Sequence, residues 1–342
     1  MKPSDISKIN LLFNDLGSKQ KLDNNYVDLV SRISKGGDII GPHPVNVQIQ
    51  TTSACNGKCA FCPYVGSWHH KNPGHMDDET FKKIVQGLKN YKILKLCPYL
   101  ENEPLLDKKI FQRLEYMVEE LKPMWVEFST NLSILTDEML THIENLFPKI
   151  KHVFWISFHG INKETYQEIM GLDYDQTMEN IRKLVELSQD LPIYLMINGS
   201  GEPILNGTLK TWFKEEEYYS FWEEQLKDYS KKPKIRFFNY HDRAGQIQLK
   251  EKNLSFNKIF RSSLQDFYCN RFDRWVHFLY SGEPILCCMD YNRETVIPLP
   301  ENKIDVENIF KSPEFVQMIR KGCGIDESED NFICKRCINP IG

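Results

Sequence analysis

The feature that most constrains the fold of this 342-residue chain is an alternation of strand-like and helix-like segments between residues 45 and 241. Six runs rich in β-branched and aromatic residues are separated by segments with helical apolar spacing. The runs occupy residues 45–52, 93–100, 125–131, 153–160, 193–199 and 234–241. Strands that are joined through helices pair in parallel. We therefore predict an α/β fold, and we favour a barrel or partial barrel over an open sheet, although the pattern alone does not decide between them.

The alternation ends near residue 250, which suggests a division of the chain into three parts. Residues 1–44 mix short apolar and polar runs and end in GGDIIGPHP, which indicates a helical extension followed by a linker. Residues 45–250 hold the alternating pattern. Residues 251–342 contain shorter segments and six of the ten cysteines, which indicates a small domain held by cysteine ligands rather than by a large core.

Composition and charge exclude several classes of protein. The net charge of −4 is spread along the chain without a basic stripe, so we do not expect nucleic-acid binding. No apolar run approaches the ~20 residues that span a bilayer, so we expect no membrane association. The first twenty residues lack the apolar core and cleavage site of a signal peptide. We therefore expect a cytoplasmic protein, in a compartment where thiols stay reduced.

The cysteines are clustered, and in a cytosolic chain this indicates metal binding or catalysis. The first cluster, in SACNGKCAFC, comprises Cys55, Cys59 and Cys62 and follows the first strand-like run. A structural zinc takes four ligands, and this loop supplies three, so His69 or His70 would have to complete a zinc site. Three thiolates also suit a [4Fe–4S] cluster with one iron open to a substrate or cofactor.

The CxxxCxxC motif just after the first strand, with Phe61 before its third cysteine, resembles that of the radical S-adenosylmethionine (SAM) superfamily. The resemblance implies that Cys55, Cys59 and Cys62 hold a [4Fe–4S] cluster whose fourth iron binds SAM. It also implies that SAM is cleaved to a 5′-deoxyadenosyl radical, which abstracts hydrogen from the substrate. The implied fold is a partial (β/α)6 barrel, a type of TIM-like barrel, which agrees with the six strand-like runs.

Further motifs follow in order at the ends of the next strands. YLENEPLLD resembles the GGE motif of the superfamily, with Glu101 and Asn102 in place of its glycines. FSTN and ISFHG place polar residues at the ends of the third and fourth strands, where a barrel site lies. Each of these could separately be a turn or a helix cap. The resemblance implies SAM-binding roles for five side chains: Phe61, Glu103, Ser129, Asn131 and Ser157.

Four cysteines of the tail have the spacing C-x17-C-x46-C-x2-C: Cys269, Cys287, Cys334 and Cys337. Zinc would also accept four cysteines. Behind a radical SAM barrel, however, the pattern resembles the twitch domain, a short form of the SPASM domain that carries one auxiliary [4Fe–4S] cluster. The chain would then hold two clusters. Neighbouring strand residues point to opposite faces, so either Cys287 or Cys288 ligates, and the spacing favours Cys287.

Two side chains are candidates for a direct part in the reaction. Of the spare thiols Cys97, Cys288 and Cys323, one could return a hydrogen atom to a substrate radical, although inert buried thiols are commoner. We take Cys288 as the catalytic candidate. Arg243, in YHDRAG, is a candidate for holding a substrate oxygen, and its alternative is a surface ion pair.

The segments NEPLLD, HGINKETYQEIMG and CCMDY most resemble those of aminocyclitol and sugar dehydrogenases and epimerases. This implies a small polyol, cyclitol or sugar substrate that is oxidised to a ketone or epimerised, and an electron donor such as flavodoxin or ferredoxin. One alternative is radical modification or epimerisation of a peptide. Another is a non-catalytic zinc-binding interaction protein. The sequence identifies neither the substrate nor the oligomeric state.

Overall fold

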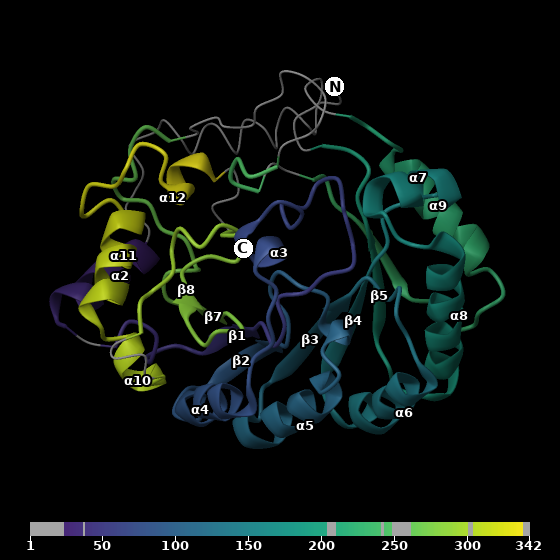
Figure 1. Ribbon diagram of the computed structural model, residues 1–342, viewed down its shortest axis with the longest axis horizontal. Helices are drawn as coiled ribbons and strands as arrows, with labels where there is room; N and C mark the ends of the chain where they lie inside the picture. The colour runs from purple at the N-terminus through teal and green to yellow at the C-terminus, as the bar shows by residue number, and fades with distance from the viewer. Residues whose placement is uncertain are drawn as a thin grey trace.

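The computed structural model describes residues 24–36, 38–203, 210–240, 243–247, 261–299 and 304–337 (Figure 1). Most of the predicted N-terminal extension, residues 1–23, lies outside the described residues. So do residues 248–260, at the expected start of the C-terminal part. The described part of the extension contains one helix, α2 (Asn24–Ser34).

In the described residues, one sheet of eight strands has the order β6-β5-β4-β3-β2-β1-β7-β8. The strands are β1 (Val45–Ile49), β2 (Ile93–Cys97), β3 (Trp125–Thr130), β4 (His152–Ser157), β5 (Leu195–Gly199), β6 (Lys234–Phe237), β7 (Trp275–Phe278) and β8 (Pro284–Ile285). All neighbours are parallel except β7 and β8. The six predicted strands and their parallel pairing are confirmed, and the curved sheet forms an open, partial barrel (Figure 1).

Helices cover the convex face of this sheet (Figure 1). They are α4 (Asp78–Leu88), α5 (Ile110–Leu121), α6 (Asp137–Leu146), α7 (Lys163–Met170), α8 (Tyr174–Asp190) and α9 (Glu215–Gln225). The long helical stretch expected after β4 is divided in two, because Gly171 has a φ of 63° and Asp173 caps the start of α8. None of the helices in the described ranges is long and apolar enough to cross a membrane.

The two faces of the sheet differ in character. On the convex face, the ring of Phe128 packs against Phe154 of the sheet and Phe111 of α5, and all three are buried between the sheet and the helices. On the concave face, the strand register aligns Gln48 of β1 with Cys97 on one side and with His277 on the other. These side chains are also buried, so the inside of the barrel is lined with polar and thiol groups rather than with an apolar core alone.

The C-terminal part is continuous with the barrel, because β7 pairs in parallel with β1 from residue 46 to residue 49. The helices described after it are α10 (Val306–Ile309), α11 (Pro313–Gly322) and α12 (Ile333–Arg336). Helix α10 packs closely on α4, where a Cβ at Gly87 would come within 2.6 Å of Val306. The second set of cysteines is thereby fixed beside the first strand of the barrel.

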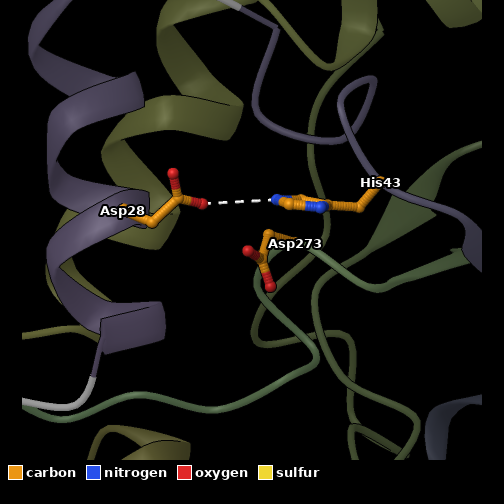
Figure 2. A group of neighbouring side chains, drawn as sticks. All are labelled: Asp28, His43 and Asp273. Atoms are coloured by element: carbon orange, nitrogen blue, oxygen red, sulfur yellow. Dashed lines mark hydrogen bonds and ion pairs between the residues drawn. The ribbon is translucent and has the colours of Figure 1, made fainter.

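Helix α2 is fastened to the tail through Arg32, whose guanidinium donates hydrogen bonds to Asp28 and to the buried Asp273. Figure 2 shows that Asp28 and His43 point toward one another beside Asp273, with His43 Nε2 and Asp28 Oδ2 3.3 Å apart. Asp273 also accepts a hydrogen bond from the Tyr268 hydroxyl at 2.8 Å. The guanidinium of Arg32 pairs with both carboxylates, so we interpret this group as an ion-pair network that anchors α2.

Candidate active site

The loop after β1 brings three thiols together. Burial is the main cause that raises the pKa of Cys55, to about 12, and that of Cys59, and the neighbouring thiols raise both further. A Cβ at Gly57 would lie 3.5 Å from the Sγ of Cys59 and 3.7 Å from that of Cys55, so the backbone passes close to both sulfurs. Buried thiolates this close repel one another unless a cation binds them. The donor set therefore fits an iron–sulfur cluster held by Cys55, Cys59 and Cys62.

Main-chain hydrogen bonds hold this loop in place. The amides of Lys58 and Ala60 donate to carbonyls at the end of α7, at 2.8 and 2.7 Å. The amide of Cys55 donates to the hydroxyl of Tyr64 at 2.8 Å. Tyr64 was not identified from the sequence, because its role depends on a loop conformation that spacing does not reveal.

Glu103, at the end of the segment after β2, is buried and fully hydrogen-bonded. Its carboxylate accepts bonds from the Thr130 hydroxyl at 2.5 Å, the Asn131 amide at 2.7 Å and the Leu105 amide at 3.1 Å. Burial nevertheless raises its pKa to about 7. The carboxylate thus ties the end of β3 to the short 3-10 helix η1 (Pro104–Leu106), and both of its oxygens are occupied by donors of the protein itself.

The three polar SAM candidates lie at the ends of β3 and β4 but differ in their partners. The amide nitrogen of the Asn131 side chain donates to Asn56 of the cysteine loop at 2.9 Å, so this residue supports the loop. Ser129 and Ser157 are half-buried on the concave side of their strands. Ser157 is in register with Asn198, whose buried side-chain oxygen has no hydrogen-bond partner among the described residues.

The ring of Phe61, within the cysteine loop, packs against two other aromatic rings. Its ring stacks on Tyr240 at 5.1 Å and meets His159 edge-on at 4.8 Å. Burial lowers the pKa of His159 to about 3, so its imidazole is neutral. This end of the barrel therefore offers uncharged flat surfaces next to the thiols.

The four cysteines predicted as the auxiliary set also come together. The pKa of Cys287 is raised by the hydrogen bond that it donates to Cys288, by burial and by the thiols of Cys337 and Cys269. Burial and the thiols of Cys269 and Cys337 raise the pKa of Cys334 in the same way. Arg261 donates hydrogen bonds to the carbonyls of Cys334 and Cys337, which fixes the end of the chain around this set.

Cys287 and Cys288 lie in the turn after β8 rather than in a strand, so the expected alternation of faces does not apply to them, and their side chains hydrogen-bond to one another. The pKa of Cys288 is lowered well below the usual range by this hydrogen bond and by the nearby Arg271 and His277. His277 belongs to the concave row described above, so Cys288 is directed toward the inside of the barrel. Cys288 also contributes to the raised pKa of Cys269, so both adjacent thiols lie near the tail set, and Cys287 as the cluster ligand stays a prediction.

A buried acid–base pair lies between the two sets of thiols. Oε2 of Glu101 and Nε2 of His69, in the short helix α3 (Trp68–Lys71), are 3.1 Å apart with no exposed side-chain area. Neither side chain has a hydrogen-bond partner elsewhere in the described part of the chain. The pKa of Glu101 is raised by burial, then by Asp290, Cys288 and Cys62. That of His69 is lowered to about 4, mainly by burial.

The sequence did not identify this pair, because Glu101 was noted only as a replaced glycine and His69 only as a possible zinc ligand. His70, the other zinc candidate, is exposed and packs edge-on against Tyr64. Tyr291 of the tail adds a further contact across the site, with its hydroxyl 3.7 Å from the Sγ of Cys62.

The remaining candidates, Arg243, Cys97 and Cys323, lie in different parts of the structure. Arg243 has a φ of 49° and places a guanidinium nitrogen 3.4 Å from the Met289 sulfur, and its charge lowers the pKa of Glu101. It therefore lies at the site rather than on a remote surface. Cys97 lies on the concave face with its sulfur 4.0 Å from a carboxylate oxygen of β3. Cys323, at the end of α11, bonds within its own turn and makes a smaller contribution to the raised pKa of Cys334.

Comparison with known proteins agrees with this geometry. Residues 49–204, from the end of β1 to beyond β5, match the model of the Radical SAM superfamily, so the chain carries a radical SAM domain. A search of curated protein sequences found no match.

Three solved structures illustrate the shared fold. SuiB of Streptococcus suis bound to the precursor peptide SuiA is 15% identical, with a TM-score of 0.60, and the alignment covers 93% of this chain and 79% of SuiB. BtrN in complex with AdoMet and 2-DOIA is 16% identical, with a TM-score of 0.55 and coverage of 88% and 95%. anSMEcpe with bound AdoMet and Cp18Cys peptide is 15% identical, with a TM-score of 0.58 and coverage of 86% and 88%. At these identities the similarity concerns the fold.

Proposed function

We propose that this chain, which carries a radical SAM domain, is a cytoplasmic two-cluster radical SAM enzyme that oxidises or epimerises a small polyol, cyclitol or sugar. The observation that supports this most directly is the placement of the two thiol sets on adjacent strands. The first follows β1, and the second surrounds β7 and β8, with Glu101 between Cys62 and Cys288. A substrate at Glu101 would be close to both sets.

The separation of the sulfurs favours iron–sulfur clusters over zinc. Thiolates on one tetrahedral zinc are about 3.8 Å apart, given a Zn–S bond of about 2.3 Å. Within the described ranges, the group of three or more candidate ligands whose atoms all lie within 4.8 Å of one another is Asp28, His43 and Asp273. No three sulfurs of either cysteine set meet that limit, so these sets suit a larger, polynuclear centre. This observation counts against the zinc-binding interaction protein.

The first cluster, when loaded with SAM, would supply the 5′-deoxyadenosyl radical that takes a hydrogen atom from the substrate. The residues of this chain then determine the outcome. Arg243 would hold a substrate oxygen, and the Glu101–His69 pair would receive the hydroxyl proton as the carbon becomes a ketone. The electron released in that oxidation would pass to a cluster on Cys269, Cys287, Cys334 and Cys337. If Cys288, holding the proton of its hydrogen bond with Cys287, instead returned a hydrogen atom, the carbon would be epimerised, and one electron from the electron donor together with one proton would restore the thiol.

A small polar substrate suits the interior of the barrel. Buried polar groups cost free energy when they lack hydrogen bonds, and a ligand with several hydroxyls would supply them. The Gln48 side-chain oxygen and that of Asn198 are two such atoms on the concave face. BtrN was solved with 2-DOIA, whereas SuiB and anSMEcpe were solved with peptides. Because the chain resembles all three to a similar degree, a peptide remains the second candidate substrate.

The test uses anaerobically purified and reconstituted protein. About eight iron and eight sulfide per chain would indicate two clusters. The protein is then incubated with SAM and with dithionite or reduced flavodoxin, and 5′-deoxyadenosine is measured with and without a panel of cyclitols, sugars and peptides. A polyol that accelerates 5′-deoxyadenosine formation and is converted to a ketone or epimer supports the proposal. Zinc without iron would refute it, and turnover of peptides alone would establish the second candidate.

A further inference from the structure

A cavity lies at the opposite edge of the sheet from the cysteine loops. It has a volume of about 530 Å³ and is formed where the strands β3 to β6 begin. Trp125, Lys151, Tyr194 and Lys234 stand at or just before these strand starts and line it. The cysteine loop, by contrast, follows the carboxyl end of β1. We call this space the basal cavity, and its volume is in the range of sites that hold small metabolites.

The basal cavity is positively charged, although the chain as a whole has a net charge of −4. Lys151, Lys234 and Arg236 line it, and none of the three has a carboxylate partner among the described residues. The acid in the lining is Glu127, and this carboxylate is already bonded to Lys95 at 2.8 Å and to the Tyr99 hydroxyl. Three positive charges around one cavity create a local potential that favours an anion of two charges.

The lining also has flat aromatic surfaces and an unused donor. Trp155 stacks on Phe238 at 6.0 Å, and the Arg236 guanidinium lies over the Trp155 ring at 6.0 Å. The indole nitrogen of Trp155 is buried and has no hydrogen-bond partner within the described ranges. The exposed rings of Trp125 and Tyr194 stand at the opening. Buried donors of this kind are normally satisfied, so the indole N–H and the guanidinium together indicate an acceptor-rich ligand.

We propose that the basal cavity binds a phosphate monoester attached to a ring, that is, a sugar phosphate or a nucleoside phosphate. The phosphate would lie among Arg236, Lys234 and Lys151, where a guanidinium can donate two parallel hydrogen bonds to its oxygens. The ring would pack against Trp125 and Trp155. This site is separate from the thiol sets and does not depend on the reaction proposed for them.

The test is isothermal titration calorimetry of the reconstituted full-length chain with uridine 5′-monophosphate, uridine and inorganic phosphate. Uridine 5′-monophosphate should bind at least 10-fold more tightly than either of the other two, because only it offers both the dianion and the ring. The affinity should fall when the salt concentration rises. The double variant K234Q R236Q should lose 10-fold or more in affinity.

The matched control is K82Q R182Q, which removes one lysine and one arginine from the exposed faces of α4 and α8. This control should bind uridine 5′-monophosphate like the wild-type chain. Both variants should keep the wild-type iron content and circular dichroism, which shows that they fold. Equal binding of uridine and its monophosphate, absence of binding, or an equal loss in the two double variants would each overturn the proposal. Because iron content is read separately, failure of this site is distinguishable from failure of the proposed enzyme activity.

Discussion

The assignment of Cys287 as a cluster ligand leads to a quantitative prediction for two adjacent residues. Cys287 has Cys269 and Cys337 as neighbours, whereas Cys288, which also lies near Cys269, has Arg271 and His277 beside it. A [4Fe–4S] cluster with four cysteine ligands loses its stable attachment when one is removed, so Cys287→Ala should lower the iron content from about eight to about four per chain. Cys288→Ala should retain about eight. The measurement is iron and acid-labile sulfide on anaerobically reconstituted protein.

The cluster that remains in Cys287→Ala should be the one that binds SAM. Reduced Cys287→Ala should therefore still cleave SAM to 5′-deoxyadenosine, while a triple substitution of Cys55, Cys59 and Cys62 should abolish this activity. Each variant removes one thiol, and the two positions are adjacent, so each variant is a matched control for the other. If Cys288→Ala lost four iron atoms and Cys287→Ala kept eight, the assignment would be reversed. If both kept eight, the reasoning from thiol proximity would be refuted.

Three further predictions concern the supports of the site. Glu103→Ala removes the acceptor of three hydrogen bonds and leaves their donors without partners. In urea denaturation it should lower the free energy of unfolding by about 4 kcal/mol, and Glu103→Gln should lower it by less. Because burial raises the pKa of Glu103 to about 7 from an ordinary 4.5, the folded state binds this proton more tightly. The free energy of unfolding should therefore fall by about 3 kcal/mol as the pH rises from 4.5 to 7, and this pH-dependent loss should be absent from Glu103→Gln. An unchanged pH profile of stability in that variant would show that Glu103 is not its source. Arg32→Ala leaves the buried Asp273 without its guanidinium partner and should lower the free energy of unfolding by about 3 kcal/mol. Asp28→Ala, at the exposed end of the same network, should lower it by less than about 1 kcal/mol. Equal losses of stability in the two variants would show that burial of Asp273 is not the reason.

The strands of the barrel could be predicted because each is a short run of apolar and β-branched residues bounded by turn signals. Their parallel order followed from the helices between them. The pairing of β7 with β1 could not be predicted, because the strands are separated by more than 220 residues and WVHF resembles any short buried strand. The break between α7 and α8 depends on the positive φ of Gly171, which in a helical pattern is indistinguishable from a tolerated glycine.

The candidate site, like the fold, could be predicted from the sequence only in part. Cysteine spacing locates the thiols, because ligation of a cluster fixes the type of residue at each position. It does not locate the groups around them, since Tyr64, His69 and Tyr291 reach the site from segments whose approach depends on tertiary packing. Which of Cys287 and Cys288 ligates stays a prediction, because both thiols lie near Cys269.

The segment ENEP shows why motif and structure must be combined. Glu103 occupies the acidic position of the resembled motif, but its two oxygens accept three hydrogen bonds from the protein, so it has little capacity left for a ligand. Glu101 occupies a position where that motif has glycine, and its oxygens have His69 as their near neighbour in a buried space between Cys62 and Cys288. A buried carboxylate in this state is costly unless a ligand or a proton satisfies it. The residue that departs from the motif is therefore the stronger candidate for contact with the substrate, and the residue that matches it is the stronger candidate for holding the strand ends in place.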